Sequence, residues 1–270
     1  MSTPILYHIY PSFYSQLARL AFVEKGVAFT SVITIAGPPF YDNYAPDYVR
    51  MNPNAVVPTL RHGDTVVFDA TRIARYVDAS FPGPRLTPEN PAEKAEMDRW
   101  IDRLDEIPIR ILSYGSMQGL SGRIAFLMND KRIAKLEQLR DTHPDLRDVY
   151  QAKIKDIRDF SHSAAVPEEV TAIRAKANAF LDELEQRLGA HEFVVGNAYS
   201  LADVVWTVTV GRMLMLKLEP FENRPQIAAW YGRMKARPSF QEADVWDTFR
   251  PGSMVHSMRE RLFSKKNEST

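Results

Sequence analysis

The sequence predicts two domains, an N-terminal α/β layer followed by an all-helical domain. Three features of the 270-residue chain support this. Residues 4–78 carry short segments in the order βαβ followed by ββα. Proline and glycine are dense at residues 82–88, and from Asn90 onward the apolar pattern is helical nearly to the end. We therefore expect a first domain at 1–82, a linker at 83–90, a helical domain at 91–250 and a polar tail at 251–270.

The first half of the N-terminal layer indicates a strand, a helix and a second strand. Residues 4–9 are apolar and precede Tyr10-Pro11-Ser12, a turn because proline restricts itself and its predecessor. Helical spacing then runs from Ser12 to Lys25-Gly26, a good stop signal. Residues 27–35 alternate as a second strand, and residues 41–51 favour a short helix.

Residues 52–78 predict a turn, two strands joined by a hairpin, and the start of a helix. Gly63 supplies the hairpin's positive backbone angle. Pro58 stands at the head of a strand, where a missing donor is tolerated. If the Val57–Pro58 bond is cis, the main chain of Val57 turns outward and offers its N–H and C=O to a ligand. Asp69 opens the next helix, whose N–H groups favour an anion such as a carboxylate.

Helix signals dominate the second domain. Asn90-Pro91 is a strong start, and a helix is expected to run from there through Trp100 towards Tyr114 with a bend at Pro108. Ser200 and Asp203 form a capping-box pattern ahead of an apolar run. The remaining helices are expected at about 123–140, 146–161, 167–188 and 204–216.

Composition excludes several classes of protein. Lysine plus arginine and aspartate plus glutamate both number 34, so net charge gives no sign of nucleic-acid binding. No apolar run suits a membrane span, and no signal peptide is visible, so we expect a cytoplasmic protein. The chain has 0 cysteines, hence no disulfide and no thiolate nucleophile of its own. The six histidines show no metal-site spacing, and there is no phosphate loop or dinucleotide fingerprint.

Two motif sets carry a resemblance to a known family. The stretch 52–78 resembles the second half of the thioredoxin-like domain of the glutathione S-transferases, through Asn52-Pro53, Val57-Pro58, Asp69, Ile73 and Tyr76-Val77. Residues 193–196 with Ser200 and Asp203 are similar to the family's C-terminal signature. Three further motifs resemble the branch that contains the tetrachlorohydroquinone dehalogenases and their plant and ganglioside-induced relatives: Pro46–Arg50, His143–Arg147 and Trp230–Arg237. The general layout is also similar to that of the bacterial β-etherases, which do not need a cysteine.

The resemblance implies an activity and a co-substrate. It implies a cytoplasmic homodimer that uses glutathione against a small-molecule electrophile, with an aryl ether or halide as the aromatic substrate class. The residues it assigns to glutathione are Val57, Pro58, Asp69, Ala70, Thr71 and Tyr14. The chain departs from the family at Ala70, where a serine or threonine hydroxyl would hold the γ-glutamyl carboxylate, and Thr71 partly compensates in this interpretation. It departs again at Tyr14, which stands where the dehalogenases carry their cysteine.

Ser12 is the first catalytic candidate. It opens a helix, where free N–H groups and the dipole favour an anion, and a hydroxyl donating to sulfur would favour the glutathione thiolate. The competing interpretation is that Ser12 only caps the helix. Ser15 is a weaker substitute, and Tyr7, Tyr10 and Tyr14 are either donors to the thiolate or pocket wall.

The second substrate is expected to meet the helical domain. Its apolar pocket candidates are Tyr10, Trp100, Tyr114, Met117 and Trp206, each of which is alternatively a core residue. Arg110 and Arg212 are candidates for meeting an anionic substrate, or are solvated or paired with a helix acid. Two other functions stay open: a fold relative that only binds ligands or partners, supported by Ala70 and Tyr14, and a thiol-disulfide oxidoreductase, which the lack of cysteine disfavours.

Overall fold

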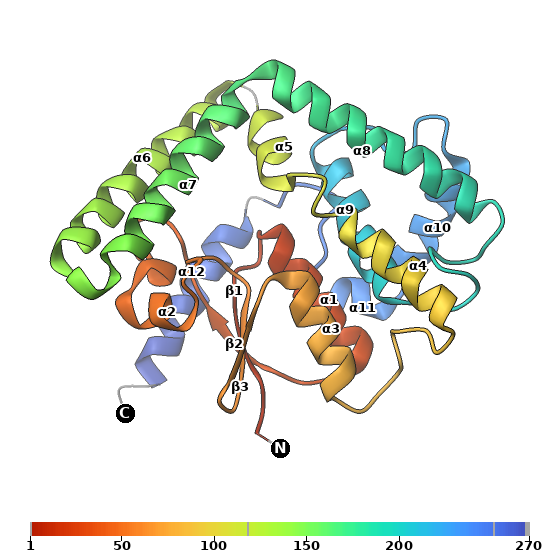
Figure 1. The fold of residues 1–270 in the computed structure, drawn as a ribbon, viewed down its shortest axis with the longest axis horizontal. Coiled ribbons are helices and arrows are strands. Elements are labelled where there is room, and N and C mark those ends of the chain that lie inside the picture. The colour runs from red at the N-terminus through yellow and green to blue at the C-terminus, as the bar shows by residue number, and fades with distance from the viewer. Residues whose placement is uncertain (1, 118, 251, 268–270) are drawn as a thin grey trace.

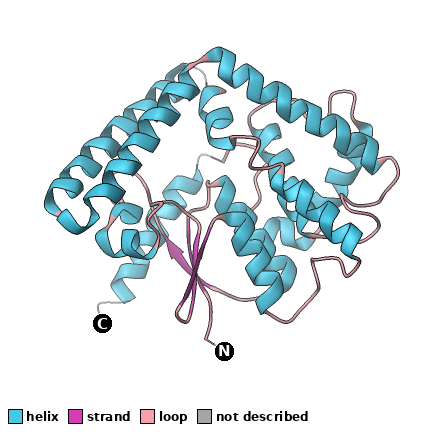
Figure 2. Cartoon of the chain, viewed as in Figure 1, coloured by secondary structure: helices cyan, strands magenta, loops and turns pink. Residues whose placement is uncertain are grey.

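A four-stranded mixed sheet forms the N-terminal layer of the computed structural model, which describes residues 2–117, 119–250 and 252–267 (Figures 1 and 2). The strand order is β2-β1-β3-β4, with β1 and β2 parallel and the other neighbours antiparallel. The predicted βαβ-ββα order is confirmed, with a helix between β2 and β3 as expected. The elements are β1 Ile5–His8, α1 Phe13–Lys25, β2 Thr30–Ile33, α2 Pro46–Met51, β3 Thr59–His62, β4 Thr65–Phe68 and α3 Ala70–Ser80.

The strand directions bring four chain segments to one edge of the sheet. The register pairs Tyr7 with Thr59 and Thr59 with Phe68, so β1 and β4 end where β3 begins. His8 pairs with Ile33, which brings the end of β2 to the same edge. Along this edge the order is therefore the loop after β2, the turn after β1, the residues before β3 and the residue after β4.

The helical domain follows α3 and covers it. Its helices are α4 Pro91–Asp102, α5 Ile109–Gly115, α6 Gly119–Thr142, α7 Arg147–Ala165, α8 Pro167–Leu188, α9 Leu201–Met215, α10 Pro225–Ala236, α11 Pro238–Glu242 and α12 Gly252–Asn267. The single bent helix expected from residue 91 to Tyr114 is wrong. The chain leaves α4 through turns at 103–107, and Pro108 becomes the N-cap of α5.

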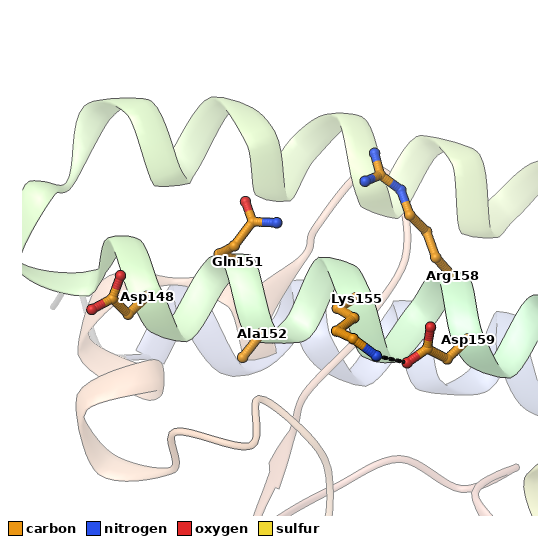
Figure 3. A pocket seen from close by; sticks show the side chains of 6 residues that line it. All are labelled: Asp148, Gln151, Ala152, Lys155, Arg158 and Asp159. Atoms are coloured by element: carbon orange, nitrogen blue, oxygen red, sulfur yellow. Dashed lines mark hydrogen bonds and ion pairs between the residues drawn. The ribbon is translucent and has the colours of Figure 1, made fainter.

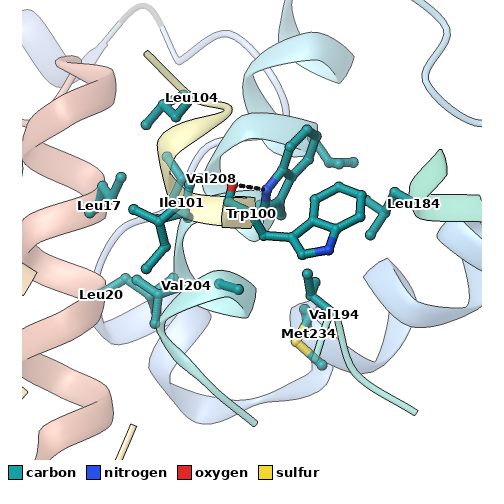
Figure 4. Packing of buried hydrophobic residues seen from close by; sticks show 14 of the residues in the cluster. Leu17, Leu20, Trp100, Ile101, Leu104, Leu184, Val194, Val204, Val208 and Met234 are labelled. Carbon is teal, nitrogen blue, oxygen red and sulfur yellow. Dashed lines mark hydrogen bonds between the residues drawn. The ribbon is translucent and has the colours of Figure 1, made fainter. Parts of the chain in front are cut away.

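The largest core joins the two domains. Leu17 and Leu20 of α1 pack against α4 and α9 (Figure 4). The Trp100 and Trp206 rings lie edge-to-face at a centroid distance of 5.3 Å. The Trp206 indole N–H donates to the Trp100 carbonyl oxygen at 2.9 Å. The predicted capping box at Ser200 and Asp203 is present and fully buried. This core fixes α1, and hence the Ser12 turn, relative to the helical domain.

The α6–α7 hairpin reaches back over α2 at the other flank of the sheet (Figure 1). Leu136 and Leu139 of α6 and Tyr150 of α7 share a buried apolar cluster with Tyr44 and Val49. The Tyr150 hydroxyl donates to the Tyr44 carbonyl oxygen at 2.9 Å. The helical domain therefore packs against the sheet domain on both sides of the edge at which β3 begins.

The expected polar tail at 251–270 is instead helical over most of its length. Helix α12 packs along β2, with Met258 against an apolar cluster that includes Ile33. Arg261 donates from Nε to Asp42 at 2.8 Å. The polar composition masks one inward face, so the sequence did not indicate a helix over residues 252–267. No helix among the described residues is both long and apolar enough to cross a membrane.

The buried histidine beneath the edge gives a testable pH dependence. The His8 ring lies 2.8 Å from Ser31 Oγ and 3.3 Å from Arg19 Nη1, and burial and the charge of Arg19 lower its pKa to about 3. Below a pH of about 6.5, position 8 then takes up a proton only in the unfolded chain. The free energy of unfolding therefore falls as the pH falls. Between pH 7 and pH 5, we expect the free energy of unfolding to drop by about 2 kcal/mol more in wild-type protein than in His8→Gln, as measured by urea titration. Parallel pH curves for the two proteins would contradict this account.

Candidate functional site

The turn after β1 presents Ser12 at the start of α1. Ser12 is half-buried and is the N-cap, because its Oγ accepts from the Ser15 N–H at 3.3 Å. The capping interpretation therefore holds for the side-chain oxygen. The Ser12 hydroxyl hydrogen has no acceptor among the described residues, so it remains available to an anion in front of the helix. Ser15 is fully buried, with its Oγ accepting from the Ile9 N–H, which removes it as a substitute.

The segment before β3 presents an unpaired stretch of main chain. The Val57–Pro58 bond is cis, as the sequence analysis considered. Within the described part of the chain, no hydrogen bond engages the Val57 N–H or C=O. Val56, by contrast, has its carbonyl oxygen held by Tyr48 and Asn52. A main-chain donor and acceptor are thus open at Val57, as required for pairing with an extended peptide-like ligand.

The residue after β4 is Asp69, which caps α3 from a backbone φ of 80°. Its Oδ1 accepts from the Thr71 and Arg72 N–H groups at 3.0 and 3.1 Å and from the Thr71 hydroxyl at 2.7 Å. Its Oδ2 has no partner among the described residues and faces solvent. The Thr71 hydroxyl donates its hydrogen to Asp69 and so cannot donate it to a ligand. The structure therefore does not support Thr71 as a replacement for the hydroxyl absent at buried Ala70.

A buried arginine, Arg212, contacts the main chain of the turn that holds Ser12. Arg212 of α9 is 8% exposed, and its Nη2 donates to the Pro11 carbonyl oxygen at 3.0 Å. No carboxylate among the described residues lies within 4.0 Å of its guanidinium. Burial lowers the pKa of Arg212 to about 10, still far above neutrality. A positive charge without a counter-ion therefore lies beside the residue that precedes Ser12.

Two of the candidate tyrosines, Tyr14 and Tyr10, lie near this turn but face different parts of the structure. Tyr14 lines a cleft, and its pKa is raised by burial and by the charge of Asp69, so its hydroxyl stays protonated. Tyr10 instead turns towards α12, with its ring 5.0 Å from that of His256. Burial and a hydrogen bond with Glu260 raise the pKa of Tyr10 to about 12. Tyr14 therefore borders the cleft, whereas Tyr10 supports the packing of α12.

The cleft lies between the start of α1, the start of α5 and one face of α7. It has a volume of about 570 Å³. Its walls combine apolar surface with charge, from Tyr14, Pro108, Arg110, Ile111, Ala152 and Phe160 among others. The Arg110 guanidinium stacks 3.8 Å from the Phe160 ring centroid and pairs with Asp156 at 3.1 Å. An aromatic molecule with a polar substituent suits such walls.

A shallow groove along α7 continues the cleft outwards. It has a volume of about 420 Å³ and shares Ala152, Lys155 and Asp159 with the cleft. Figure 3 shows Ala152, Lys155 and Asp159 on one side of α7, whereas Gln151 and Arg158 point towards α6. This charged groove lies on a solvent-facing surface.

Trp100 and Trp206 are core residues, the alternative that the sequence left open for them. They are 3% and 1% exposed, so neither reaches a ligand. Met117 follows α5 and lines neither the cleft nor the groove. Tyr114 is half-buried, edge-on to Phe160 at a centroid distance of 4.8 Å, and its hydroxyl receives a bond from Arg132. Tyr114 therefore stands behind the cleft wall.

Two residues that the sequence analysis did not single out belong to this region. Phe160 supplies the aromatic wall, and Arg132 contacts the loop after β2 through the Ala36 carbonyl oxygen at 3.2 Å. A signal for Arg132 was present, because it shares the helical spacing of Leu136 and Leu139, which face the sheet domain. Among the described residues, no group of three or more potential ligands is arranged to hold a metal ion.

Two family models match the chain. One is described as the N-terminal domain of glutathione S-transferase and matches residues 6–85. The other is described as the C-terminal domain of glutathione S-transferase and matches residues 127–238. Between them they span both layers of the fold.

Curated relatives match over nearly their full lengths. A tetrachloro-p-hydroquinone reductive dehalogenase of Sphingobium chlorophenolicum is 34% identical over 249 residues, which covers 92% of this chain and 98% of the relative. Protein LigF of Sphingobium sp. is 27% identical over 272 residues, which covers 97% of each. The dehalogenase resemblance noted from the motifs thus extends over 92% of the chain.

Solved structures share the fold. The β-etherase LigF of Sphingobium sp. superposes with a TM-score of 0.69 at 24% identity, covering 90% of this chain and 98% of that one. A theta class glutathione S-transferase of Xanthomonas axonopodis pv. citri, solved with glutathione bound, gives 0.66 at 23% identity, covering 90% and 97%. At these identities the structural matches establish the architecture.

Two substitutions at Asp69 test whether its acceptor oxygen, rather than its charge, stabilises the start of α3. Asn keeps an acceptor oxygen for the α3 N–H groups, so we expect Asp69→Asn to stay within about 0.5 kcal/mol of wild-type stability. Ala removes the acceptor, so Asp69→Ala should lose about 1 kcal/mol. Urea unfolding of both variants measures the difference. Equal losses would show that the Oδ1 bonds do not hold the helix start.

Proposed function

The chain belongs to the glutathione S-transferase family, and on that basis we propose that it binds glutathione along the sheet edge and activates its thiolate with Ser12. The observation that carries the proposal is the open Val57 main chain beside a Ser12 hydroxyl with no acceptor among the described residues. Glutathione is an extended tripeptide, so its cysteinyl main chain pairs with Val57 while its sulfur reaches the start of α1. The chain supplies no sulfur nucleophile of its own.

Thiolate formation depends on positive potential at the turn. A thiol such as that of glutathione has a pKa of about 8.5, and about two units of depression make it mostly ionised at neutral pH. The Ser12 hydroxyl donates to the sulfur, the α1 dipole adds to this, and the unpaired Arg212 lies behind Pro11. Each of these groups favours the anion over the neutral thiol.

The γ-glutamyl end of glutathione meets Asp69. Its ammonium group pairs with the free Oδ2, and the neighbouring carboxylates increase the negative potential there. Burial, Asp69 and Asp102 together raise the pKa of Asp105, which shows how closely these acids gather. The α-carboxylate lacks the usual hydroxyl at Ala70 and relies on the N–H groups at the start of α3.

The electrophile occupies the cleft beside Tyr14. The thiolate attacks an electrophilic carbon, a C–S bond forms, and the C–O or C–halogen bond breaks with its electron pair leaving on the phenolate or halide. The protonated Tyr14 hydroxyl donates a hydrogen bond to the sulfur or to the leaving atom. Aryl ethers and aryl or benzylic halides fit a cleft whose walls include the Phe160 ring and the Arg110 guanidinium.

A second candidate function is a ligand-binding protein that no longer turns glutathione over. The observation in its favour is that no side-chain hydroxyl replaces the one missing at Ala70, because Thr71 is bonded to Asp69. Both functions predict the same fold, but only the enzyme is expected to ionise bound glutathione to its thiolate. A calorimetric glutathione titration that stays flat, together with no turnover of a chloronitroaromatic, would favour the second.

Replacement of the Ser12 hydroxyl tests thiolate activation directly. We expect wild-type protein with bound glutathione to show thiolate absorbance near neutral pH, and Ser12→Ala to shift that titration upwards by about one pH unit or more. Turnover should fall about 10-fold or more, since a charge-assisted hydrogen bond is lost. Ser12→Thr keeps the hydroxyl and the cap and should restore both. An unchanged thiolate titration in Ser12→Ala would refute the assignment.

Two neighbouring α7 positions test the cleft. Ala152 lines the cleft and is exposed, so a phenyl ring fits there without breaking the core. We expect Ala152→Phe to lower kcat/KM for an aromatic electrophile by about 10-fold or more, because it occupies the cleft, while glutathione affinity stays unchanged. Gln151 lines the outer groove and not the cleft, and it points towards α6 (Figure 3). Gln151→Phe is therefore the matched control: it loses an exposed hydrogen bond with Arg140 but should leave kcat/KM unchanged. Equal effects from both variants would place the electrophile elsewhere.

A further inference from the structure

One arginine of the α6–α7 hairpin lies over the sheet edge without a counter-ion. Arg132 is half-buried and none of the described carboxylates lies within 4.0 Å of it. Among arginines whose side chains are described and not exposed, only Arg132 and Arg212 share this property. A guanidinium drawn out of water without a counter-ion is costly even when its N–H groups are partly bonded, so a ligand anion would offset that cost.

The hydrogen bonds of Arg132 leave one nitrogen open. Its Nε donates to the Ala36 carbonyl oxygen at 3.2 Å, and Nη1 donates to Asn129 Oδ1 at 2.8 Å and to the Tyr114 hydroxyl at 3.4 Å. These three bonds use three of the five N–H groups of a guanidinium. Among the described residues, no acceptor takes either hydrogen of Nη2, and Nη2 lies 3.8 Å from the position that a Cβ on Gly37 would occupy.

The guanidinium is held as a charged and positioned group. Burial lowers its pKa while the nearby Tyr114 and Tyr44 raise it, and the net result is a pKa above the usual arginine value. Its helix is seated on the sheet domain by Leu136, one turn further along α6, within the buried cluster. The Arg50–Asp145 ion pair at 2.8 Å joins the same hairpin to α2. Arg132 is therefore fixed above the loop that follows β2.

The strand order shows which part of the ligand reaches this loop. Along the edge, the segments follow one another as Gly37 after β2, Ser12 after β1, Val57 before β3 and Asp69 after β4. In the proposed binding mode the γ-glutamyl end lies at Asp69 and the cysteinyl residue at Val57 and Ser12. The tripeptide therefore continues towards Gly37, and its last group is the glycyl carboxylate.

We propose that Arg132, supplied by the helical domain, binds the glycyl carboxylate of glutathione through Nη2. The inference rests on the proposed function, because it requires glutathione at this edge. It makes the α6–α7 hairpin part of the co-substrate site in addition to the wall of the cleft. Charge then alternates along the ligand, with an acid facing the ammonium end and an arginine facing the carboxylate end.

The test compares two ligands that differ only at the glycyl carboxylate. Glutathione and its glycyl monoethyl ester are titrated by calorimetry into wild-type protein, Arg132→Gln, Arg132→Lys and Arg50→Gln. We expect wild-type protein to bind the acid about 10-fold or more tightly than the ester, because the ester carries no negative charge there. Arg132→Gln should bind the acid as weakly as the ester, and Arg132→Lys should recover part of the preference.

The controls separate binding from folding. Arg50→Gln removes another arginine that joins the hairpin to α2, so it should keep the wild-type preference for the acid. A merely structural role of Arg132 would weaken acid and ester by the same factor, which overturns the inference. An unchanged preference in Arg132→Gln, or an effect confined to the KM of the electrophile, overturns it as well. Failure of wild-type protein to bind either ligand refutes the proposed function itself.

Discussion

The strand order of the sheet is the constraint on which the rest of the site depends. Because β1, β2 and β4 end where β3 begins, four short segments meet at one edge in a fixed sequence. No single segment makes a binding site: Ser12 is a cap, Asp69 is a cap, and Val57 is an unpaired stretch of main chain. The proposed binding of a tripeptide depends on the alignment of these local features along one edge.

The helical domain completes that edge from two sides. On one side, α9 packs against α1 through the tryptophan core and places Arg212 behind the Ser12 turn. On the other side, the α6–α7 hairpin packs over α2 and places Arg132 above the loop after β2. Both cations lack carboxylate partners among the described residues, and each donates to a main-chain carbonyl oxygen beside the edge. The same packing that stabilises the two-domain fold thus sets the electrostatics of the edge.

The sequence predicted what is local and missed what depends on facing elements. The Val57–Pro58 pair, the Asp69 helix start and the Ser200–Asp203 box are local motifs, and each appears where expected. The sequence leaves Trp100 and Trp206 open between pocket and core, because an inward aromatic on a helix can face either a cleft or another helix. Arg132 was overlooked for the same reason. Its lack of a counter-ion is visible only once the hairpin is folded onto the β2 loop.

The central claim is that glutathione lies along this edge with its cysteinyl main chain paired to Val57. A crystal structure of the protein with glutathione tests it most directly. The account predicts both Val57 hydrogen bonds, the sulfur within hydrogen-bond distance of Ser12 Oγ, and the γ-glutamyl end at Asp69. Glutathione bound elsewhere, or a Val57 main chain left unpaired beside it, would contradict the account.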